Sequence, residues 1–238
     1  MSQFNRTEKL VGSSSFKAIQ SSKVSIVGVG GVGSYAAEAI VRAGISNVQI
    51  WDGDVVDISN INRQLVALHS TIGEKKVKVL TNRYLDINPS INLESLDINF
   101  GATSKQNLVD FNPDFVIDCI DSIKDKIELI DLCTVLNIPI ISVMGAGNKF
   151  DPGRFKVVDI KKTHTDPLAR IIRREASARK WGKLPVISSD EIPVKGTGEP
   201  VGSISFVPSV AGLMAAGYVI NNIITRKGDS HGTDWSGN

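Results

Sequence analysis

The chain has 238 residues, of which 42% are hydrophobic and 22% are charged, and its formal net charge is +2. These values are typical of a soluble protein with one large α/β domain or two small ones, and they give no global indication of a nucleic-acid binder. Two cysteines, Cys119 and Cys133, are too few for a disulfide framework or a zinc cluster. The polar segment 1–16 lacks the apolar stretch of a secretion signal, so we expect a cytoplasmic protein.

Short apolar segments and longer amphipathic segments alternate along the first part of the chain. Residues 23–27 predict a strand, and a glycine-rich turn joins it to a helix that ends near Gly44. We expect further strands over 47–51, 91–97, 114–120 and 139–143, and helices over 74–88, 103–111 and 123–137. Thr103 is the expected cap of one helix, and Pro89 ends another. This alternation predicts a Rossmann-like, mainly parallel sheet with helices on both faces.

The C-terminal part follows this alternation less closely. Residues 155–160 predict one more strand, and 210–225 predict a final helix. Residues 185–202 are rich in Pro, Gly, Ser and Glu, which is typical of a mobile loop. The segment 204–224 is apolar enough to be mistaken for a membrane span. Its proline, glycines and asparagines favour a helix buried against the sheet or a subunit partner, without stable membrane insertion.

A glycine pattern lies between the first strand and the first long helix. Gly28 permits a tight turn, Gly30 lets the backbone approach phosphate or ribose, and Gly33 lets the helix pack close to the strand. The helix N-terminus offers N–H groups to an anion. Asp52 ends the second strand at the spacing of an acid that hydrogen-bonds ribose hydroxyls. The pattern predicts a nucleotide site, and the alternative is a tight turn without a ligand.

Two cations and one acid indicate that the phosphates of the nucleotide are contacted. Arg63 follows the second strand and Lys76 opens the next helix, so both could converge on a triphosphate. For Lys76 taken alone, a solvated helix face is the simpler interpretation. Asp121 follows the end of a predicted strand, where a carboxylate is well placed to hold Mg²⁺ against phosphate oxygens. Asp121 could equally cap the following helix, and both roles are compatible.

These residues, in this order and spacing, resemble the adenylation domain of E1-like enzymes, the ThiF, MoeB and HesA superfamily. The resemblance implies an E1-like fold with an antiparallel C-terminal extension, with ATP and Mg²⁺ as cofactors. It implies that Asp52 binds ribose, that Asp121 holds magnesium, and that Arg63, Lys76 and Asp121 are catalytic. The nucleotide-contacting residues implied by the resemblance are Gly28, Gly30, Gly31, Gly33, Asp52, Asp54, Asn60, Arg63, Gln64, Lys76 and Ser122. Arg6 resembles an N-terminal arginine that reaches the γ-phosphate of a neighbouring subunit, which implies a homodimer.

The resemblance extends to one branch of this superfamily. Protein-activating members often carry zinc-binding Cys-x-x-Cys pairs or an acceptor cysteine in the crossover loop, and this chain has neither. Cys119 and Cys133 lie in a predicted strand and helix, where buried thiols are inert. The segments 118–122, 145–147 and 162–169 resemble the tRNA threonylcarbamoyladenosine dehydratases. That resemblance implies ATP-dependent activation of the threonyl carboxylate of t6A at tRNA position 37. Ring closure then gives cyclic t6A with net loss of water, and a sulfur-transfer protein is a possible partner.

A basic segment gives an independent indication of RNA contact. Between residues 161 and 183 there are eight Lys and Arg residues against two acids, a net charge of +6. Such a local excess is how a phosphate backbone is bound, and Trp181 could stack on a base. The predicted tRNA-binding residues are Lys161, Lys162, Arg170, Arg173, Arg174, Arg179 and Lys180. The alternative is a solvated helix whose Leu168, Ile171 and Ile172 face the core.

We expect one domain over 1–238, with a nucleotide-binding core at 20–150 and a substrate-contact and dimerisation region at 151–238. Three other functions fit part of the pattern. The first is an activator of a ubiquitin-like or sulfur-carrier protein. The second is a nicotinamide-dependent dehydrogenase, which would leave Arg63, Lys76 and Asp121 without a role. The third is a non-catalytic nucleotide-binding scaffold, for which Ser122 leaves room because many relatives have Asn there.

Overall fold

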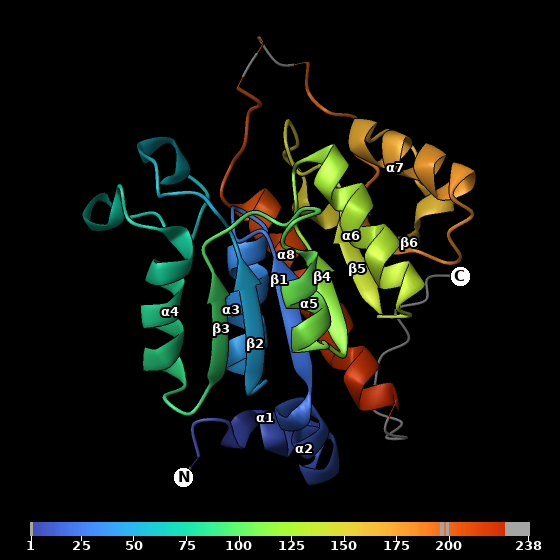
Figure 1. Cartoon of the computed structure of the whole chain (residues 1–238). Helices are drawn as coiled ribbons and strands as arrows, with labels where there is room; N and C mark the ends of the chain where they lie inside the picture. The colour runs from blue at the N-terminus through green and yellow to red at the C-terminus, as the bar shows by residue number, and fades with distance from the viewer. Residues whose placement is uncertain (1, 196–197, 199, 227–238) are drawn as a thin grey trace.

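The computed structural model describes residues 2–195, 198 and 200–226. Seven strands form one sheet in the order β3-β2-β1-β4-β5-β7-β6 (Figure 1). The strands are β1 (Lys23–Val27), β2 (Asn47–Trp51), β3 (Asn92–Leu96), β4 (Phe115–Asp118), β5 (Ile140–Val143), β6 (Phe155–Asp159) and β7 (Pro185–Ser189). Neighbouring strands are parallel except β6 and β7, which are antiparallel. The predicted mainly parallel sheet and its antiparallel C-terminal extension are therefore confirmed.

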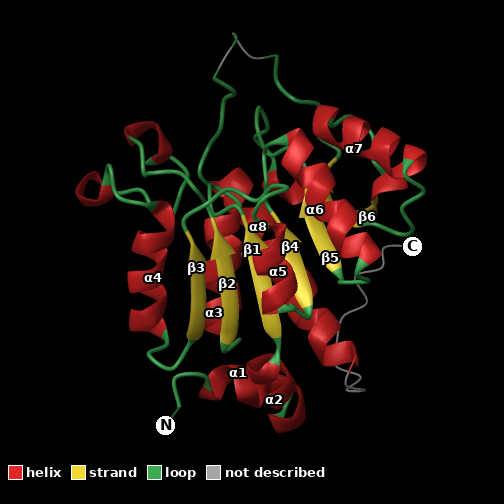
Figure 2. Cartoon of the chain, in the orientation of Figure 1, coloured by secondary structure: helices red, strands yellow, loops and turns green. Residues whose placement is uncertain are grey.

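Helices cover both faces of this sheet (Figure 2). They are α1 (Asn5–Val11), α2 (Ser13–Ser21), α3 (Gly33–Ala43), α4 (Lys76–Ile87), α5 (Lys105–Phe111), α6 (Ile123–Val135), α7 (Pro167–Ala178) and α8 (Phe206–Arg226). Successive residues of β4 enter different cores: Ile117 packs with α3, α4 and α8, whereas Val116 packs with α5, α6 and α7. A parallel strand that is buried on both faces reads as a continuous apolar run, which is why the strand pattern was recognisable.

The segment 185–202, predicted to be a loop, begins with a strand. Val186 and Ile187 of β7 are fully buried, and β7 lies between β5 and β6. The loop prediction is wrong for residues 185–189, because two apolar residues among Pro, Gly and Ser are too short a signal to mark a central strand. Residues 196, 197 and 199 of the predicted mobile loop lie outside the described residues.

Most helix boundaries agree with the sequence to within a few residues. Gly44 is the left-handed C-cap of α3, with φ of 106°. Ser104, rather than the predicted Thr103, is the N-cap of α5. Helix α8 begins at Phe206, four residues before the predicted start. The helix can include Pro208 because this residue lies in the first turn, where a missing N–H costs no helical hydrogen bond. Helices α1 and α2 lie in a polar segment for which no element was predicted.

Helix α8 packs along α3 on one face of the sheet. A Cβ atom at Gly212 would lie 2.2 Å from the carbonyl oxygen of Val32, so the two helices approach as closely as a glycine allows. Within the described residues, α8 is the helix long and apolar enough to cross a membrane by length and composition, and half of its apolar window is buried in the fold. This packing supports the predicted buried helix.

Candidate active site

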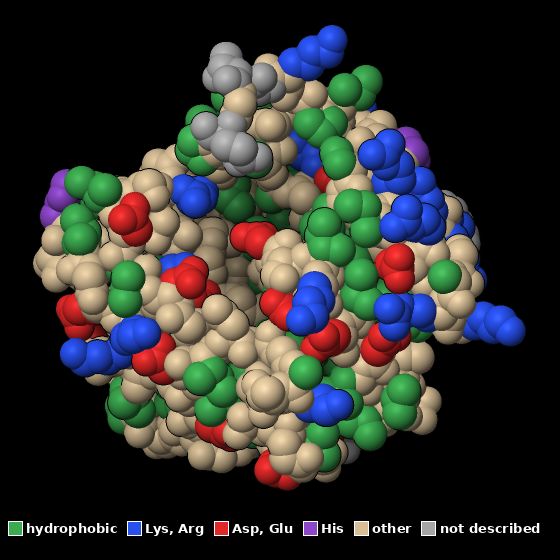
Figure 3. All heavy atoms as spheres, turned by 45° about the horizontal axis from the view of Figure 1, so that its top comes forward, with side chains coloured by type: hydrophobic (Ala, Val, Ile, Leu, Met, Phe, Trp, Pro, Cys, Tyr) green, Lys and Arg blue, Asp and Glu red, His purple; other side chains and the backbone are tan. Residues whose placement is uncertain are grey.

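A pocket of about 1050 Å³ opens at the carboxyl ends of the parallel strands. Val27 of β1, Trp51 of β2 and Val143 of β5 reach it from below. Figure 3 looks onto this end of the molecule and shows the hollow between acidic and basic side chains. This is the crevice in which open α/β sheets bind their ligands.

The glycine turn forms one wall of the pocket. Gly28 has a φ of +85°, and a Cβ atom there would lie 2.8 Å from the carbonyl oxygen of Cys119. A Cβ atom at Gly33 would lie 1.8 Å from the carbonyl oxygen of Gly28, so only glycine fits. Gly30 and Gly31 line the pocket directly, whereas Gly33 supports the turn from behind. The turn thus presents the N-terminus of α3 to the pocket, as an anion site requires.

Asp52 is tied into the backbone at the end of β2. Its Oδ2 accepts the Val29 N–H at 2.9 Å and its Oδ1 accepts the Asp54 N–H at 3.0 Å. The carboxylate is buried and lines the pocket. Its remaining lone pairs are available to ribose hydroxyls, because each carboxylate oxygen accepts more than one hydrogen bond.

Lys76 is buried at the pocket wall. Its Nζ lies 2.7 Å from Asp54 Oδ2 and 3.5 Å from Asp52 Oδ1. The alternative of a solvated helix face is therefore wrong for Lys76. It holds for the neighbouring Lys75, which is half-exposed and pairs with Asp97 at 3.1 Å.

A short 3₁₀ helix, η1 (Ile58–Asn60), and the turn after it hold the remaining phosphate candidates. Asn60 is buried, and its Oδ1 accepts the Asp57 N–H at 3.1 Å. Arg63 donates to the Ser59 carbonyl at 2.8 Å, which holds its guanidinium at the pocket. Gln64 is buried, and its Oε1 has no hydrogen-bond partner among the described residues. Such an orphaned acceptor beside Gly30 fits a pocket that receives a donor from a ligand.

Asp121 is not a helix cap. Ser122 caps α6, accepting the Asp125 N–H at 3.5 Å, so the capping interpretation of Asp121 is wrong. Among the described residues, Asp121 has no side-chain hydrogen bond or ion pair, and it lines the pocket. Desolvation there raises the pKa of the Asp121 carboxyl above its usual value, and the nearby charge of Lys126 opposes this shift only in part.

A metal ion at this site would depend on a nucleotide for most of its ligands. In the described ranges, no group of three or more His, Cys, Asp and Glu side chains is placed to hold one. Mg²⁺ fits an unpaired carboxylate beside a phosphate site, because it keeps several waters and is bound through one or two carboxylates plus phosphate oxygens. Asp121 is the side chain that meets this description.

A buried ion pair beneath the pocket was not predicted from the sequence. Lys126 Nζ donates to Asp118 Oδ2 at 2.8 Å and to the Val143 carbonyl at 3.1 Å, and both charged side chains are fully buried. The pair joins the carboxyl ends of β4 and β5. Its only sequence signal is a lysine at an inward position of α6, which is ambiguous without the partner.

The two cysteines are not suited to act as nucleophiles. Cys133 is buried in α6, and Cys119 lies one residue beyond β4 at the pocket wall, not inside the strand. Burial raises the pKa of both thiols well above the usual value. Because the thiolate is the nucleophilic form, both thiols stay protonated and unreactive at neutral pH.

Two further segments line the pocket without having been predicted. Asn99 accepts the Gly53 N–H at 3.0 Å, and Phe100 packs edge-on against Trp51 with ring centroids 5.7 Å apart. Residues 201–203 approach from the far end of the sequence, and Asn62 donates to the Ser203 carbonyl at 3.0 Å. No local pattern marks these segments, because only the fold brings them to the glycine turn.

The structure divides the basic segment into two groups. Arg173 donates to Thr163 Oγ1 at 3.0 Å, and Arg179 pairs with Asp131 and Glu175. Arg179 is itself exposed but is held by these ion pairs, and the other exposed cations of the predicted set are Lys161, Lys162, Arg170, Arg174 and Lys180. Figure 3 shows Lys and Arg side chains gathered on the α7 side of the pocket mouth.

Trp181 does not face the solvent. Its side chain is 4% exposed, and its Nε1 donates to Asp131 Oδ1 at 2.6 Å. The predicted base-stacking role is therefore wrong. The position of Trp181 beside a basic run suggested exposure, but its ring packs in the core between α6 and α7.

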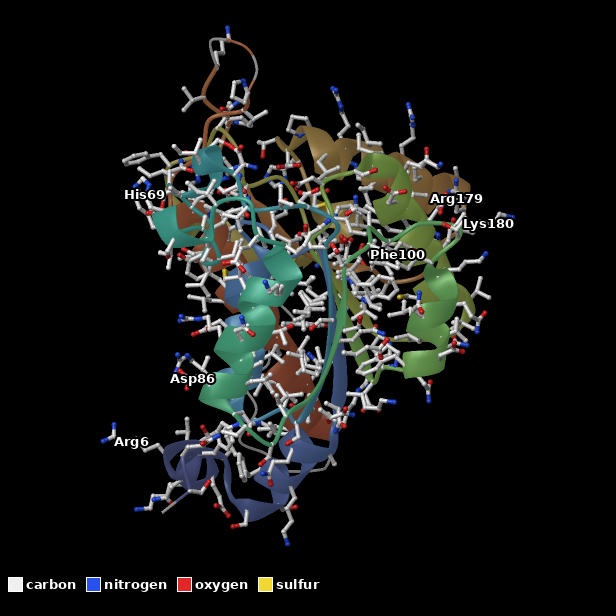
Figure 4. All side chains as sticks on the ribbon, turned by 60° about the vertical axis from the view of Figure 1, so that its left-hand side comes forward. Arg6, His69, Asp86, Phe100, Arg179 and Lys180 are labelled. Carbon is white, nitrogen blue, oxygen red and sulfur yellow. The ribbon has the colours of Figure 1, made fainter. Side chains whose placement is uncertain are left out.

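Arg6 lies far from this pocket. It is exposed on α1 at one end of the molecule, well away from Phe100 of the pocket (Figure 4). The pocket of the same chain therefore has no contact with Arg6. The predicted contact with a neighbouring subunit stays a prediction.

Comparisons with known proteins agree with this geometry. The ThiF family matches residues 4–234. A tRNA threonylcarbamoyladenosine dehydratase of Bacillus subtilis is 41% identical over 240 residues, which cover 93% of this chain and 94% of the relative. The Escherichia coli protein of that name is 36% identical over 171 residues, covering 72% of this chain and 64% of the relative.

Solved structures show the same similarity. The crystal structure of E. coli tRNA N6-threonylcarbamoyladenosine dehydratase in complex with AMP has a TM-score of 0.89 and 31% identity, covering 94% of each chain. The structure of that protein in complex with ATP has a TM-score of 0.88 over the same coverage.

Proposed function

This chain belongs to the ThiF family, and we propose that it is an ATP-dependent tRNA threonylcarbamoyladenosine dehydratase. The observation that carries the proposal is a pocket that joins a glycine turn, buried Lys76, Arg63 and an unpaired Asp121, with no reactive thiol at its wall. The 41% identity to the B. subtilis dehydratase over nearly the whole of both chains supports the same substrate.

The proposed reaction has two steps. A carboxylate oxygen of the threonyl group of t6A attacks the α-phosphorus of ATP, and the bond to pyrophosphate breaks. A nitrogen of the same modified base then attacks the acyl carbon, loses its proton and expels AMP with the carboxylate oxygen. The products are cyclic t6A, AMP and pyrophosphate, so the nucleoside has lost one water. Ring closure is intramolecular, which agrees with the protonated, unreactive thiols of Cys119 and Cys133.

The residues of the pocket act by position and charge. Lys76, Arg63 and the N-terminus of α3 neutralise the phosphates as negative charge builds on the leaving pyrophosphate. Asp52 orients the ribose, and Asn60, Gln64, Asp54 and Ser122 complete the nucleotide contacts with the glycines. Fixing two reactants in an attack geometry supplies a large part of such a rate enhancement.

Magnesium is proposed as the companion of ATP. Asp121 would hold it, and the ion would supply charge neutralisation at the phosphate oxygens when bound. The protein's part is to keep this carboxylate unpaired and aimed into the pocket.

The wider assembly is proposed on the same basis. One adenylation domain spans residues 1–238, with its nucleotide core at 20–150 and its tRNA-contact and dimerisation region at 151–238. The exposed cations of α7 and its flanks bind tRNA near position 37, and a homodimer would bring Arg6 to the pocket of the partner. The enzyme works in the cytoplasm, where tRNA is modified, and a sulfur-transfer protein is a candidate partner.

The decisive experiment is mass analysis of tRNA nucleosides after incubation with the protein, ATP and Mg²⁺. We expect t6A to lose one water while AMP and pyrophosphate are released, and RNase pretreatment to abolish the ATP consumption. If neither AMP nor a lighter nucleoside is formed, the proposal is contradicted. Pyrophosphate exchange that requires a carrier protein with a free C-terminus would identify a protein activator. Thermal protection by NAD but not by ATP would identify a dehydrogenase, and ATP binding without turnover would identify a scaffold.

A further inference from the structure

A second buried ion pair connects the pocket to the basic helix α7. Lys149 lies in the loop after β5, and residues 144–147 of this loop line the pocket. Its Nζ donates to Asp166 and to the Gly145 carbonyl, and both charged side chains are 1% exposed. The pair therefore lies directly behind the pocket wall.

Asp166 uses each of its oxygens for a different purpose. Oδ2 accepts from Lys149, and Oδ1 accepts the Ala169 N–H at 2.8 Å as the N-cap of α7. A Cβ atom at Gly145 would lie 2.7 Å from Asp166 Oδ2, so the carboxylate rests on the backbone of the pocket loop. One carboxylate thus joins the first turn of α7 to the pocket wall.

The rest of the loop and the other end of α7 are also fixed. Asn148 exchanges two hydrogen bonds of 2.8 Å with Gly202, a pocket-lining residue. At the C-terminal end of α7, Asp131 of α6 accepts from Arg179 and from Trp181. Helix α7 is therefore held at both ends, while Arg170 and Arg174 on its outer face stay exposed.

Stability alone does not explain a fully buried ion pair. Removing two charges from water is costly, and an apolar pair of similar volume is often as stable or more so. What the pair does supply is geometry, because the Lys149 ammonium contacts the Gly145 carbonyl and the Asp166 carboxylate at once while the same carboxylate caps α7. We propose that Lys149 and Asp166 are positioning residues that fix α7 at one distance and angle from the nucleotide pocket.

This inference rests on the proposed function. If the exposed cations of α7 bind the phosphate backbone of tRNA, the placement of α7 decides where the modified base lies relative to ATP. A displacement of about 1 Å far from the reacting atoms can reduce a rate about a hundredfold. The pair would then act on the rate of adenylation rather than on the affinity for either substrate.

The test is the double variant Lys149→Met/Asp166→Asn, which leaves no unpaired buried charge and keeps an N-cap, since Asn caps as well as Asp. We expect kcat on t6A-bearing tRNA to fall about tenfold to a hundredfold. The Kd for ATP and the Kd for tRNA, each measured by direct binding, should stay within about twofold of wild type. The matched control Glu38→Gln/Arg83→Met removes an ion pair of 2.8 Å between α3 and α4 and should leave kcat unchanged.

The outcomes separate clearly. Unchanged kcat in the double variant would overturn the inference. A parallel loss of ATP affinity would assign the pair to the pocket itself, and a loss of tRNA affinity that accounts for the whole effect would assign it to RNA binding. Either result also overturns the inference.

If the double variant does not fold, Asp131→Asn releases Arg179 at the other end of α7 and should lower kcat with both Kd values retained. If the wild-type protein shows no turnover, the proposed function is contradicted instead.

Discussion

Lys76 Nζ lies 2.7 Å from Asp54 Oδ2, and the two partners differ sharply in exposure, 6% for Lys76 and 62% for Asp54. The ammonium is thus held in the pocket wall while its carboxylate partner faces solvent. An incoming phosphate can reach the amine beside this solvated carboxylate without moving the buried Lys76 side chain. Such preorganised charge is what stabilises a transition state most effectively.

We expect Lys76→Ala to cost about 2–4 kcal/mol of transition-state stabilisation, the scale for removing one preorganised charge donor. The measurement is kcat/KM for formation of AMP from ATP with t6A-bearing tRNA. Lys75→Ala is the matched control, because Lys75 precedes it in sequence and pairs with Asp97 outside the pocket. Equal rates in the two variants would remove Lys76 from the mechanism.

Arg63→Ala should have an effect of the same size, about 2–4 kcal/mol, because Arg63 lines the same pocket as Lys76. The loss should appear in kcat more than in the affinity for ATP if the charge acts on the leaving pyrophosphate. Arg42→Ala is the matched control, because it removes an exposed arginine on α3 that pairs with Glu38 at 2.6 Å. Wild-type turnover in Arg63→Ala would contradict its assignment.

Asp121→Asn should abolish turnover while making the ligand-free protein more stable. Desolvation raises the pKa of this carboxyl in the folded protein, so folding favours its protonated form. Any stabilisation from it is present below its unfolded pKa and is lost as pH rises through the folded pKa. The Asp121 side chain is exposed in the ligand-free pocket, so at neutral pH its charge opposes folding only weakly, and the neutral amide should raise Tm slightly. A lower Tm at pH 7, measured by differential scanning calorimetry, would contradict this.

The same shift predicts the pH dependence of magnesium use. The carboxylate must be ionised to bind the cation, so Mg²⁺ affinity should weaken on acidification at a higher pH than for an ordinary aspartate. Titration of turnover with Mg²⁺ at several pH values measures this. A Mg²⁺ requirement that does not change with pH over the acid range would argue against Asp121 as the ligand.

Arg170→Ala/Arg174→Ala should weaken tRNA binding and lower the slope of log K against log salt by about 1.8 if both residues contact duplex phosphates. Both side chains are exposed, whereas Arg173 and Arg179 make structural bonds and are not suitable for this test. Lys9→Ala/Lys17→Ala removes the same charge from α1 and α2, at the other end of the molecule. Equal salt slopes in the two double variants would count against the α7 surface.

Gly212→Ala should destabilise the fold by about 1–3 kcal/mol, because overpacking forces α8 away from α3. Gly217→Ala is the matched control in the same helix, since a Cβ atom there meets nothing within 4 Å. The control should gain about 0.5–1 kcal/mol from helix propensity. Chemical denaturation of the purified protein measures both. A stable Gly212→Ala variant would contradict the packing of α8 on α3.

The sequence alone determined the elements whose signals are local. Gly28 and Gly33 mark the turn, because no other residue fits that conformation or that approach, and Gly44 marks the end of α3. The buried strands β1 and β2 are short and mainly apolar. Asp52 and Lys76 were recognisable from their order after β2, and Asp121 from its place after β4.

Only the tertiary structure decided which distant groups meet. Val186 and Ile187 form a central strand because β5 and β6 flank them, although their neighbours in sequence resemble a loop. Trp181 turned inward because Asp131 and the α6–α7 core receive its ring. The Lys149–Asp166 pair spans a long stretch of chain, and nothing in either segment identifies its partner. The physical reason is that turns and caps depend on a few neighbouring residues, whereas the burial of a charge or an aromatic ring depends on what the whole fold brings against it.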